Sequence, residues 1–461
     1  MKTLKSSDAS PAKAARGLWR TLFGSLGWFG VEQSLYTLTR GMNPALRQSL
    51  KPLVRGLWYG KGHRRLKELA TSHQQVRPAL SKYRVFCLPI IDWEFRTQRP
   101  QQLLARLAGR GCPVVYLRTD FGSGTRLGWT KLLPPLVEGL RLPGPSNLTI
   151  YGDPPCETTV NSWLNALEVE GVAGDGIVTT SFVQWPFWTP LAIAARRRWG
   201  WPVIYDCLDD HAAFATTDRA TLELEATLLA ESDLVIATSA ALLEKCKRVA
   251  RRCILVPNAG DVAHFSRGTK IRRRGRGEPI VVGYVGAISE SFDVELVRRA
   301  AGAYPGWRFE LVGLNSGLNL KSLAELGNVS LLGERTYDAL PSLVDHFDVA
   351  MIPFKVTPLT AAVNPVKLYE YLAAGKPVVA SSIPELEAFA RDIYLARDPA
   401  SFVQLLSVAI EEDNRERRAS RVAVARANDW DQRVALIDRE IRGVLHGGPS
   451  ENAVAAPGDR L

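Results

Sequence analysis

The stretch NPVKLYEYLAAGKPVVAS, residues 364–381, predicts a helix followed directly by a buried strand. Asn364 is a favoured N-cap residue, and Pro365 suits the first helical position because its missing N–H would have no partner there. Gly375 favours the left-handed conformation that ends a helix, so we expect the helix to run from about Pro365 to Ala374. The β-branched run at 377–381 then predicts a strand. The segment therefore indicates one helix–strand unit of an α/β domain.

Two charged side chains on this helix predict a nucleotide site. The unpaired N–H groups and the dipole at a helix start favour anions. Glu370 lies five residues beyond Pro365, which is roughly 7–8 Å along the axis and comparable to the span from a diphosphate to a ribose. Glu370 can thus accept hydrogen bonds from ribose hydroxyls while Lys367 neutralises phosphate oxygens. The alternative is a capped surface helix with both side chains in solvent.

Short apolar runs alternate with helical patterns along most of the chain. The predicted strands are 84–90, 113–117, 175–182, 201–208, 233–239 and 253–258, then 279–286, 307–313, 329–333, 349–354 and 377–381. Helices are expected at 99–111, 218–231 and 430–445. Strands rich in Val and Ile that are separated by helices indicate parallel sheets buried on both faces. We therefore predict an α/β protein with two Rossmann-like, doubly wound domains, and a ligand outside the carboxyl ends of their strands.

The composition divides the chain into further parts. We expect a basic, helical N-terminal extension, a first domain, a basic glycine-rich linker, a second domain, a final amphipathic helix and a disordered tail. Their predicted bounds are 1–80, 81–263, 264–278, 279–429, 430–446 and 447–461.

The positive charge of the protein is concentrated in its first 80 residues. The 461-residue chain has a formal net charge of +11, and residues 1–80, with fourteen Lys or Arg and three acids, carry all of it. Together with Trp19, Phe23, Trp28, Phe29 and Trp58, this stretch suits an anionic membrane surface. The alternative is a solvated helical extension packed on the body. A nucleic-acid partner is disfavoured, because the remainder of the chain is neutral.

Other sequence features bear on the location of the protein. No run of eighteen apolar residues occurs, so no membrane-spanning helix is expected. The first twenty residues lack an apolar core with a small-residue cleavage site, unlike a secretory signal. The six cysteines include no CxxC pair, which is typical of reduced thiols in the cytosol. We expect a cytoplasmic protein that is peripheral on the inner face of the plasma membrane through residues 1–80.

The 364–381 segment resembles the donor-binding segment of GT-B glycosyltransferases of the bacterial family-4-like, glycosyltransferase family 1 type. Members commonly show an E-x7-E pattern that ends in a segment like EAMAxGxPVV. Glu370 occupies the second glutamate of that pattern, whereas the first position is Ala362, where this sequence departs from it. The Asn-Pro-x-Lys-x-x-Glu core is similar to a subgroup of polysaccharide-assembly transferases, in which Asn364 and Lys367 would do part of the work of the missing glutamate.

The resemblance extends over most of residues 83–445. The matching segments, in chain order, are WEFRTQRPQQLLARLA (93–108), YDCLDDHAAF (205–214), ESDLVIATSAALLE (231–244), VPNAGDVAHF (256–265), PIVVGYVGAIS (279–289) and WDQRVALIDREI (430–441). It implies a first domain that binds the acceptor, a second domain that binds a nucleotide-diphosphate sugar, and a C-terminal helix that crosses back to the first domain. It implies no cofactor beyond the donor substrate.

An acidic cluster follows the predicted strand at 201–208. Asp206, Asp209, Asp210 and His211 lie where ligands bind in such sheets, and a carboxylate or imidazole there can take the proton of an attacking hydroxyl. The alternative is an aspartate that caps the following helix. The spacing is Asp-x-x-Asp-Asp rather than the metal-binding DxD, so we expect no metal.

Candidate site residues also follow two other strands. After the first strand, Asp92 can act as the base, Trp93 can stack on a sugar and Arg99 can hold an acceptor anion. The alternative for this group is an Arg99–Asp92 ion pair that orders the loop. In GYVGAIS, Gly283 and Gly286 predict a strand-to-helix turn that lets backbone approach a phosphate, unless they serve tight packing.

The sequence thus predicts a glycosyltransferase that moves a sugar from a nucleotide-diphosphate sugar to a lipid-linked or polysaccharide acceptor. The alternatives are a nucleotide-sugar epimerase on the same fold, which would act without an acceptor, and a non-catalytic GT-B partner in polysaccharide assembly.

Overall fold

The first of two α/β domains is built on an eight-stranded sheet. In this computed structural model, residues 83–145, 147–266 and 277–447 are described; the expected N-terminal extension and most of the expected tail lie outside them. The strands are β1 (Tyr83–Leu88), β2 (Val114–Leu117), β3 (Gly128–Lys131), β4 (Val137–Arg141), β5 (Val178–Val183), β6 (Val203–Cys207), β7 (Leu234–Ala237) and β8 (Cys253–Leu255). Their order is β3-β4-β2-β1-β5-β6-β7-β8, and every pairing is parallel except β3 with β4.

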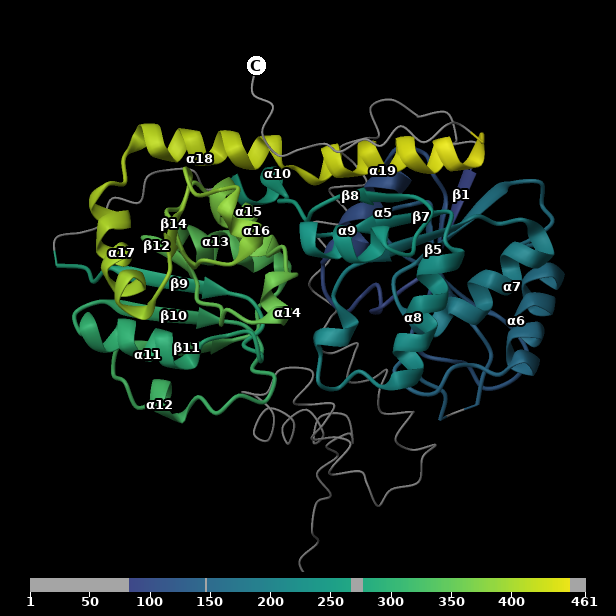
Figure 1. The fold of residues 1–461 in the computed structure, drawn as a ribbon, viewed down its shortest axis with the longest axis horizontal. Coiled ribbons are helices and arrows are strands. Elements are labelled where there is room, and N and C mark those ends of the chain that lie inside the picture. The colour runs from purple at the N-terminus through teal and green to yellow at the C-terminus, as the bar shows by residue number, and fades with distance from the viewer. Residues whose placement is uncertain (1–82, 146, 267–276, 448–461) are drawn as a thin grey trace, which may run out of the picture.

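Helices cover both faces of this sheet (Figure 1). They are α5 (Arg99–Gly109), α6 (Glu157–Val169), α7 (Thr189–Trp199), α8 (Arg219–Glu231) and α9 (Ala240–Lys247), with 3-10 turns η1 (Pro186–Trp188) and η2 (His211–Ala213). The short α10 (Val262–Phe265) follows β8 and packs into the core of the second domain. Strands β1, β2, β6 and β7 are buried along their whole length. Such strands consist of continuous apolar runs because both of their faces pack against helices.

The second domain repeats this architecture with six parallel strands. These are β9 (Val281–Val285), β10 (Arg308–Val312), β11 (Val329–Gly333), β12 (Val349–Ile352), β13 (Val378–Ser381) and β14 (Tyr394–Ala396), in the order β11-β10-β9-β12-β13-β14. The helices are α11 (Val294–Ala303), α12 (Lys321–Ala324), α13 (Leu340–His346), α14 (Pro358–Ala361), α15 (Val366–Ala373), α16 (Pro384–Glu387), α17 (Pro399–Glu411) and α18 (Arg415–Ala427), with a 3-10 turn η4 (Tyr337–Ala339). The predicted α/β class with two doubly wound domains is confirmed.

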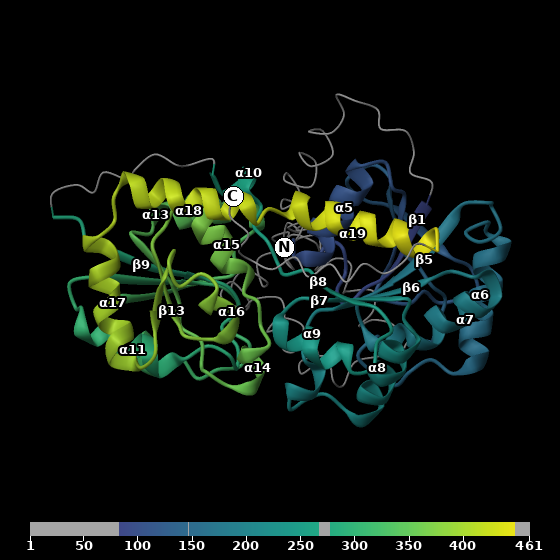
Figure 2. The same ribbon diagram turned by 45° about the horizontal axis from the view of Figure 1, so that its top comes forward.

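A final helix, α19 (Trp430–Leu445), returns to the first domain. Figures 1 and 2 show α18 along the second domain and α19 along the first, on the same side of the molecule. Trp430, Val434, Ile437 and Ile441 are buried in the same apolar cluster as α5 and β1, and Tyr83 Oη donates a 2.6 Å hydrogen bond to Asp438. The apolar face of α19 therefore packs on the first strand and first helix of the described residues.

The structure corrects several sequence predictions at the edges of the domains. The edge strands β3 and β14, the strand β4 beside β3, and the helices α17 and α18 were not predicted. The linker was expected to begin at residue 264, but His264 and Phe265 are buried in α10, and Phe265 belongs to the core of the second domain. Apolar packing therefore continues beyond the point where the basic composition begins.

Candidate active site

The carboxyl ends of the two sheets meet at the junction of the domains. Arg96, after β1, forms a 2.6 Å ion pair with Glu334, after β11. The N–H of Ala240, after β7, donates a 2.7 Å hydrogen bond to Glu385, after β13. The arrows of β9 and β10 accordingly point toward the first domain (Figure 1). Because ligands of open α/β sheets bind outside the carboxyl ends of the strands, this junction is the candidate site.

The start of α15 differs from the prediction in one respect. The N-cap residue is Pro365, and the Asn364 side chain does not cap the helix. Asn364 Oδ1 instead accepts hydrogen bonds from Asn258 N (3.1 Å) and Tyr369 Oη (3.1 Å), and Nδ2 donates to Glu385 (2.9 Å). Asn364 thus ties α15 to residues 256–265, which follow β8 and which we call the crossover segment. Gly375 ends the helix with φ 70°, as predicted.

Glu370 is buried without a hydrogen bond to its carboxylate among the residues that the structure describes. Its side chain is 9% exposed. Burial raises the pKa of Glu370 to about 7, repulsion from Asp261 adds to this, and attraction from Lys367 opposes it. A buried carboxylate of this kind is costly unless a donor reaches it. Perturbed carboxyl groups in clefts are candidates for function, and this one stands where the sequence placed the ribose contact.

Lys367 lies in an apolar setting one turn before Glu370. Its Nζ is 4.5 Å from the centroid of the Phe354 ring and 5.6 Å from that of Tyr284. Burial lowers the pKa of Lys367 to about 8, against the attraction of Glu370. The ammonium therefore lies beside two ring faces, and an anion would stabilise its charged form.

The two glycines of the GYVGAIS segment have different roles. Gly286 has φ 151°, and a Cβ added there would lie 2.8 Å from Lys367 Cε, so the turn after β9 runs directly beside Lys367. Gly283 lies inside β9, where an added Cβ would lie within 2.2 Å of the Phe347 ring. The prediction that Gly283 belongs to the phosphate turn is therefore wrong, because this glycine makes room for packing. Gly286 remains a candidate for close approach of a donor.

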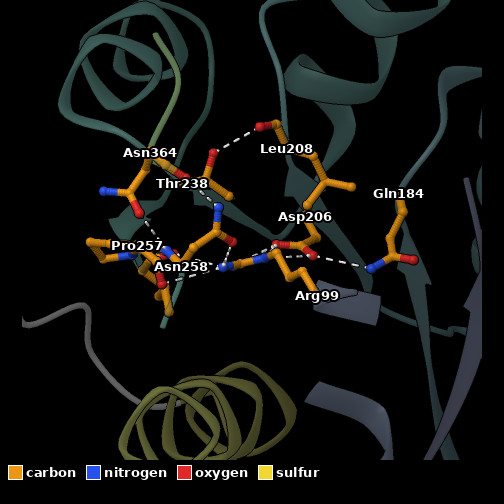
Figure 3. Close-up of polar contacts among 9 residues, drawn as sticks. Arg99, Gln184, Asp206, Leu208, Thr238, Pro257, Asn258 and Asn364 are labelled. Atoms are coloured by element: carbon orange, nitrogen blue, oxygen red, sulfur yellow. Dashed lines mark hydrogen bonds and ion pairs between the residues drawn. The ribbon is translucent and has the colours of Figure 1, made fainter. Parts of the chain in front are cut away.

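Arg99 is the centre of a buried polar network at the carboxyl end of β6 (Figure 3). Its guanidinium contacts Asp206 Oδ1 at 2.9 Å and donates to Val256 O at 3.0 Å and Asn258 Oδ1 at 3.3 Å. Asp206 Oδ2 also accepts a 3.2 Å hydrogen bond from Gln184. Neither an acceptor-binding Arg99 nor an Arg99–Asp92 pair is found, because Arg99 uses its donors to fix Asp206 and the crossover segment.

Replacing Arg99 with methionine is expected to destabilise the protein by about 3–5 kcal/mol, because it leaves the fully buried Asp206 carboxylate without its cation. The measurement is chemical denaturation followed by tryptophan fluorescence. Arg219→Met, which breaks the exposed Arg219–Glu223 pair, is the matched control and should cost less than about 1 kcal/mol. A similar small effect at Arg99 would contradict a structural role for this network.

Asp92 and Trp93 also have structural partners. Asp92 Oδ1 accepts a 3.0 Å hydrogen bond from Thr119 N, which fixes the loop after β2. The Trp93 ring is 4% exposed and packs edge-on against Tyr116, with 5.0 Å between ring centroids. The prediction that Trp93 stacks on a sugar is wrong, because this ring forms part of the core. The hydrogen bond to Thr119 argues against Asp92 as the base.

The residues after β6 form the remaining polar cluster. Asp210 accepts a 2.8 Å ion pair from Lys245, which also contacts the buried Glu225 at 3.3 Å. His211 is 3% exposed, and its Nε2 has no hydrogen-bond partner among the described residues. Burial raises the pKa of Asp209 and lowers the pKa of His211. Asp209 and His211 are therefore the members of the predicted set that are suited to accept a proton, whereas Asp210 is held by Lys245.

Three further findings concern a cavity away from this junction, metal-binding groups and membrane-spanning helices among the described residues. A cavity of about 400 Å³ is lined by Arg84, Val114, Trp129 and Leu136, among others, at the amino ends of the first domain's strands. No group of three or more His, Cys, Asp or Glu side chains in the described ranges is arranged to hold a metal ion. In the same ranges, every helix is too short or too polar to cross a lipid bilayer.

Comparison with solved structures places the architecture in the GT-B class of glycosyltransferase folds. The sucrose-phosphate synthase (tll1590) of Thermosynechococcus elongatus superposes with a TM-score of 0.61 at 16% identity, over 79% of this chain and 100% of that one. The alpha,alpha-trehalose 6-phosphate synthase of Burkholderia multivorans gives 0.58 at 12% identity, over 80% and 100%. At these identities the likeness shows the fold, which is the one that the sequence resemblance implied.

Residues 279–412, in the second domain, match the family "Glycosyl transferases group 1". A curated relative from Bacillus subtilis (strain 168), named as a teichuronic acid biosynthesis glycosyltransferase, TuaH, is 31% identical over 161 residues. The match covers 33% of this chain and 41% of the relative, so it spans about two fifths of the relative's length. The predicted recognition as a GT-B, family 1 type chain is confirmed.

Sequence reasoning missed several residues at the junction. Glu385 links Ala240 of the first domain to Asn364 of the second, and Asp261 faces Glu370 closely enough to raise its pKa. Tyr151 and Trp185 form an aromatic edge beside His211. Asp261 lies in the VPNAGDVAHF segment (256–265) that carries part of the resemblance, and that match was the available signal for it.

Proposed function

We propose that this chain transfers a sugar from a nucleoside-diphosphate sugar to the hydroxyl of a glycan acceptor. The observation that carries the proposal is the Glu370 carboxylate, which is buried and lacks a hydrogen bond from the described residues. Glu370 lies one helical turn beyond Lys367 on α15. The backbone of Gly286 runs beside Lys367. In this arrangement the ribose hydroxyls donate to Glu370, while Lys367 and the first N–H groups of α15 bind the diphosphate.

The groups that take the proton of the acceptor hydroxyl lie in the first domain. The acceptor oxygen forms a bond to the anomeric carbon, and the bond from that carbon to the diphosphate oxygen breaks. The hydroxyl proton passes to the Asp209–His211 pair, and the leaving diphosphate takes the electron pair of the broken bond. Lys367 and the α15 amides stabilise the negative charge that develops on it.

A thermal-shift screen against uridine, guanosine, adenosine and thymidine diphosphate sugars tests the donor site. A ligand present at about one hundred times its Kd stabilises the folded state by about 2.7 kcal/mol. We expect one nucleotide to stabilise the protein well above the others, and its free diphosphate to compete. If none of them shifts the unfolding temperature at millimolar concentration, the proposed donor site is wrong. Turnover of the donor to an isomer without an acceptor would favour the epimerase alternative.

We further propose that the acceptor is lipid-linked or a polysaccharide at a membrane surface. The basic, aromatic composition of residues 1–80 supports this, and the name of the Bacillus relative places that protein in teichuronic acid biosynthesis. Each Lys or Arg near an anionic surface contributes about 1 kcal/mol.

Full-length protein is therefore expected to sediment with phosphatidylglycerol vesicles and not with phosphatidylcholine vesicles. A chain lacking residues 1–80 should bind about one hundredfold more weakly, which corresponds to roughly three basic contacts. Sedimentation at low and at 0.5 M salt measures this, since salt screens the attraction. A full-length protein that never binds anionic vesicles contradicts the membrane proposal and leaves the donor site unaffected.

A further inference from the structure

Three aromatic rings adjoin one another at the carboxyl edge of the first sheet. The Tyr151 and Trp185 rings meet edge-on, with 5.7 Å between centroids and an interplanar angle of 63°. The Trp185 and His211 rings follow at 5.0 Å and 89°. Trp185 comes after β5, and His211 comes after β6. Tyr151, Trp185 and His211 therefore form a row of rings that leads from an exposed loop to the proposed proton acceptor.

Hydrogen bonds to main-chain carbonyls fix the orientation of the two outer rings. Tyr151 Oη donates to Ile90 O at 2.6 Å, and Trp185 Nε1 donates to Ile150 O at 2.6 Å. The polar atom of each side chain is thereby used within the protein.

Tyr151 is 61% exposed despite this anchoring. Most other large rings near this edge are in the core, as the buried Trp188 and Phe187 show. Holding an aromatic ring rigidly in water forgoes the free energy of burying it, and such exposed rings mark binding surfaces. The partly buried Trp185 extends this surface inward toward His211.

We propose that Tyr151 and Trp185 form an acceptor subsite that binds one face of a pyranose ring. The axial C–H groups of a sugar carry a small positive charge, and the face of an aromatic ring is negative. A sugar stacked there extends toward the Asp209–His211 pair, so a neighbouring hydroxyl reaches the group that takes its proton. This inference rests on the proposed function, because it names the substrate class of the same site.

Saturation-transfer NMR with methyl α- and β-glycosides of glucose, galactose, mannose and N-acetylglucosamine tests the subsite. These probes carry no aromatic group that could itself stack on a ring. We expect saturation of the C–H protons on one face of at least one glycoside. Tyr151→Ala and Trp185→Ala should each weaken its binding about tenfold or more. Tyr151→Phe keeps the ring and should bind within about threefold of the unmodified protein.

Trp129→Ala is the matched control, because Trp129 is an aromatic residue that is 43% exposed on the outermost strand β3 and lines the separate cavity beside Arg84. It should leave glycoside binding unchanged. Equal binding by Tyr151→Ala and the unmodified protein would overturn the subsite, as would the absence of binding by every glycoside. Thermal stabilisation of the protein by a nucleotide distinguishes failure of the sugar subsite from failure of the proposed function. If a nucleotide still stabilises a protein that binds no glycoside, only the subsite fails; if no nucleotide stabilises it, the proposed function fails.

Discussion

Replacing Glu370 with glutamine is expected to weaken donor binding by about 30- to 1000-fold. The amide keeps the shape of the side chain but loses the charge that strengthens hydrogen bonds from two ribose hydroxyls, each of which is worth about 1.5–3 kcal/mol when the acceptor is charged. Calorimetric titration with the nucleotide found in the screen measures the loss. Unchanged affinity in Glu370→Gln would contradict the ribose contact on which the donor site is built.

The same substitution is expected to stabilise the unliganded protein. The pKa of Glu370 is raised from its ordinary 4.5 to about 7, so the folded state holds a proton that the unfolded state has lost. Ionising this carboxyl in the folded state therefore costs up to about 3 kcal/mol, and the cost is fully present above pH 7 and disappears below pH 4.5. Glu370→Gln removes it, so the gain in unfolding free energy should be larger at pH 8 than at pH 5.

Glu225→Gln is the matched control for this gain. Glu225 is also buried, but it accepts hydrogen bonds from Tyr205 and Lys245. The same substitution there should lower stability, because it weakens contacts that already exist. A loss of stability in Glu370→Gln like that in Glu225→Gln would show that Glu370 is a structural residue.

Donor affinity is also expected to depend on pH, because Glu370 and Lys367 change their charge near neutral pH. Below about pH 7 Glu370 is protonated, and above about pH 8 Lys367 is neutral. Affinity should therefore be highest between these values and fall on both sides. Lys367→Met should remove the fall at high pH and leave the fall at low pH, which a titration series from pH 5.5 to 9.5 would reveal.

The central strands and the terminal helix could be predicted from sequence because their signals are local. Apolar runs such as those of β1 and β7 are buried on both faces, and the amphipathic repeat of α19 is long. The strands β3 and β4 escaped prediction because their burial is incomplete and their sequences, GWTK and VEGLR, mix polar residues with few apolar ones. β3 is at the edge of the sheet and β4 is next to it, where strands need less apolar surface, so periodicity identifies them poorly.

The partners of the site residues could not be predicted in the same way. Arg99 and Asp206 are 107 residues apart, and they meet because β1, β5 and β6 are neighbours in the sheet order. Sequence proximity instead suggested Asp92 as the partner of Arg99. The spacing of Glu370 and Lys367 could be predicted because both lie on one helix, whereas Tyr151 lies in a loop that is held by contacts across the fold, such as its hydrogen bond to Ile90 O.

Replacing His211 with asparagine is expected to lower the rate of sugar transfer by roughly 10²- to 10⁴-fold, which is the usual contribution of a positioned general base. Burial lowers the pKa of His211, so its imidazole is neutral at pH 7 and can accept a proton. The substitution lies in the first domain, whereas Glu370 and Lys367 lie in the second, so nucleotide affinity should not change. Release of nucleoside diphosphate from the donor identified in the screen measures the rate.

Two aspartate substitutions distinguish catalysis by His211 from a structural effect. Asp210→Asn should reduce the rate much less, because Asp210 is held by Lys245 rather than by the reacting groups. Asp209→Asn separates the remaining possibilities for the proton acceptor. If it abolishes transfer while His211→Asn leaves the pH–rate profile intact, the proton goes to Asp209, whose pKa is raised by burial. If both variants transfer sugar at the original rate, the acceptor hydroxyl does not lose its proton at this cluster.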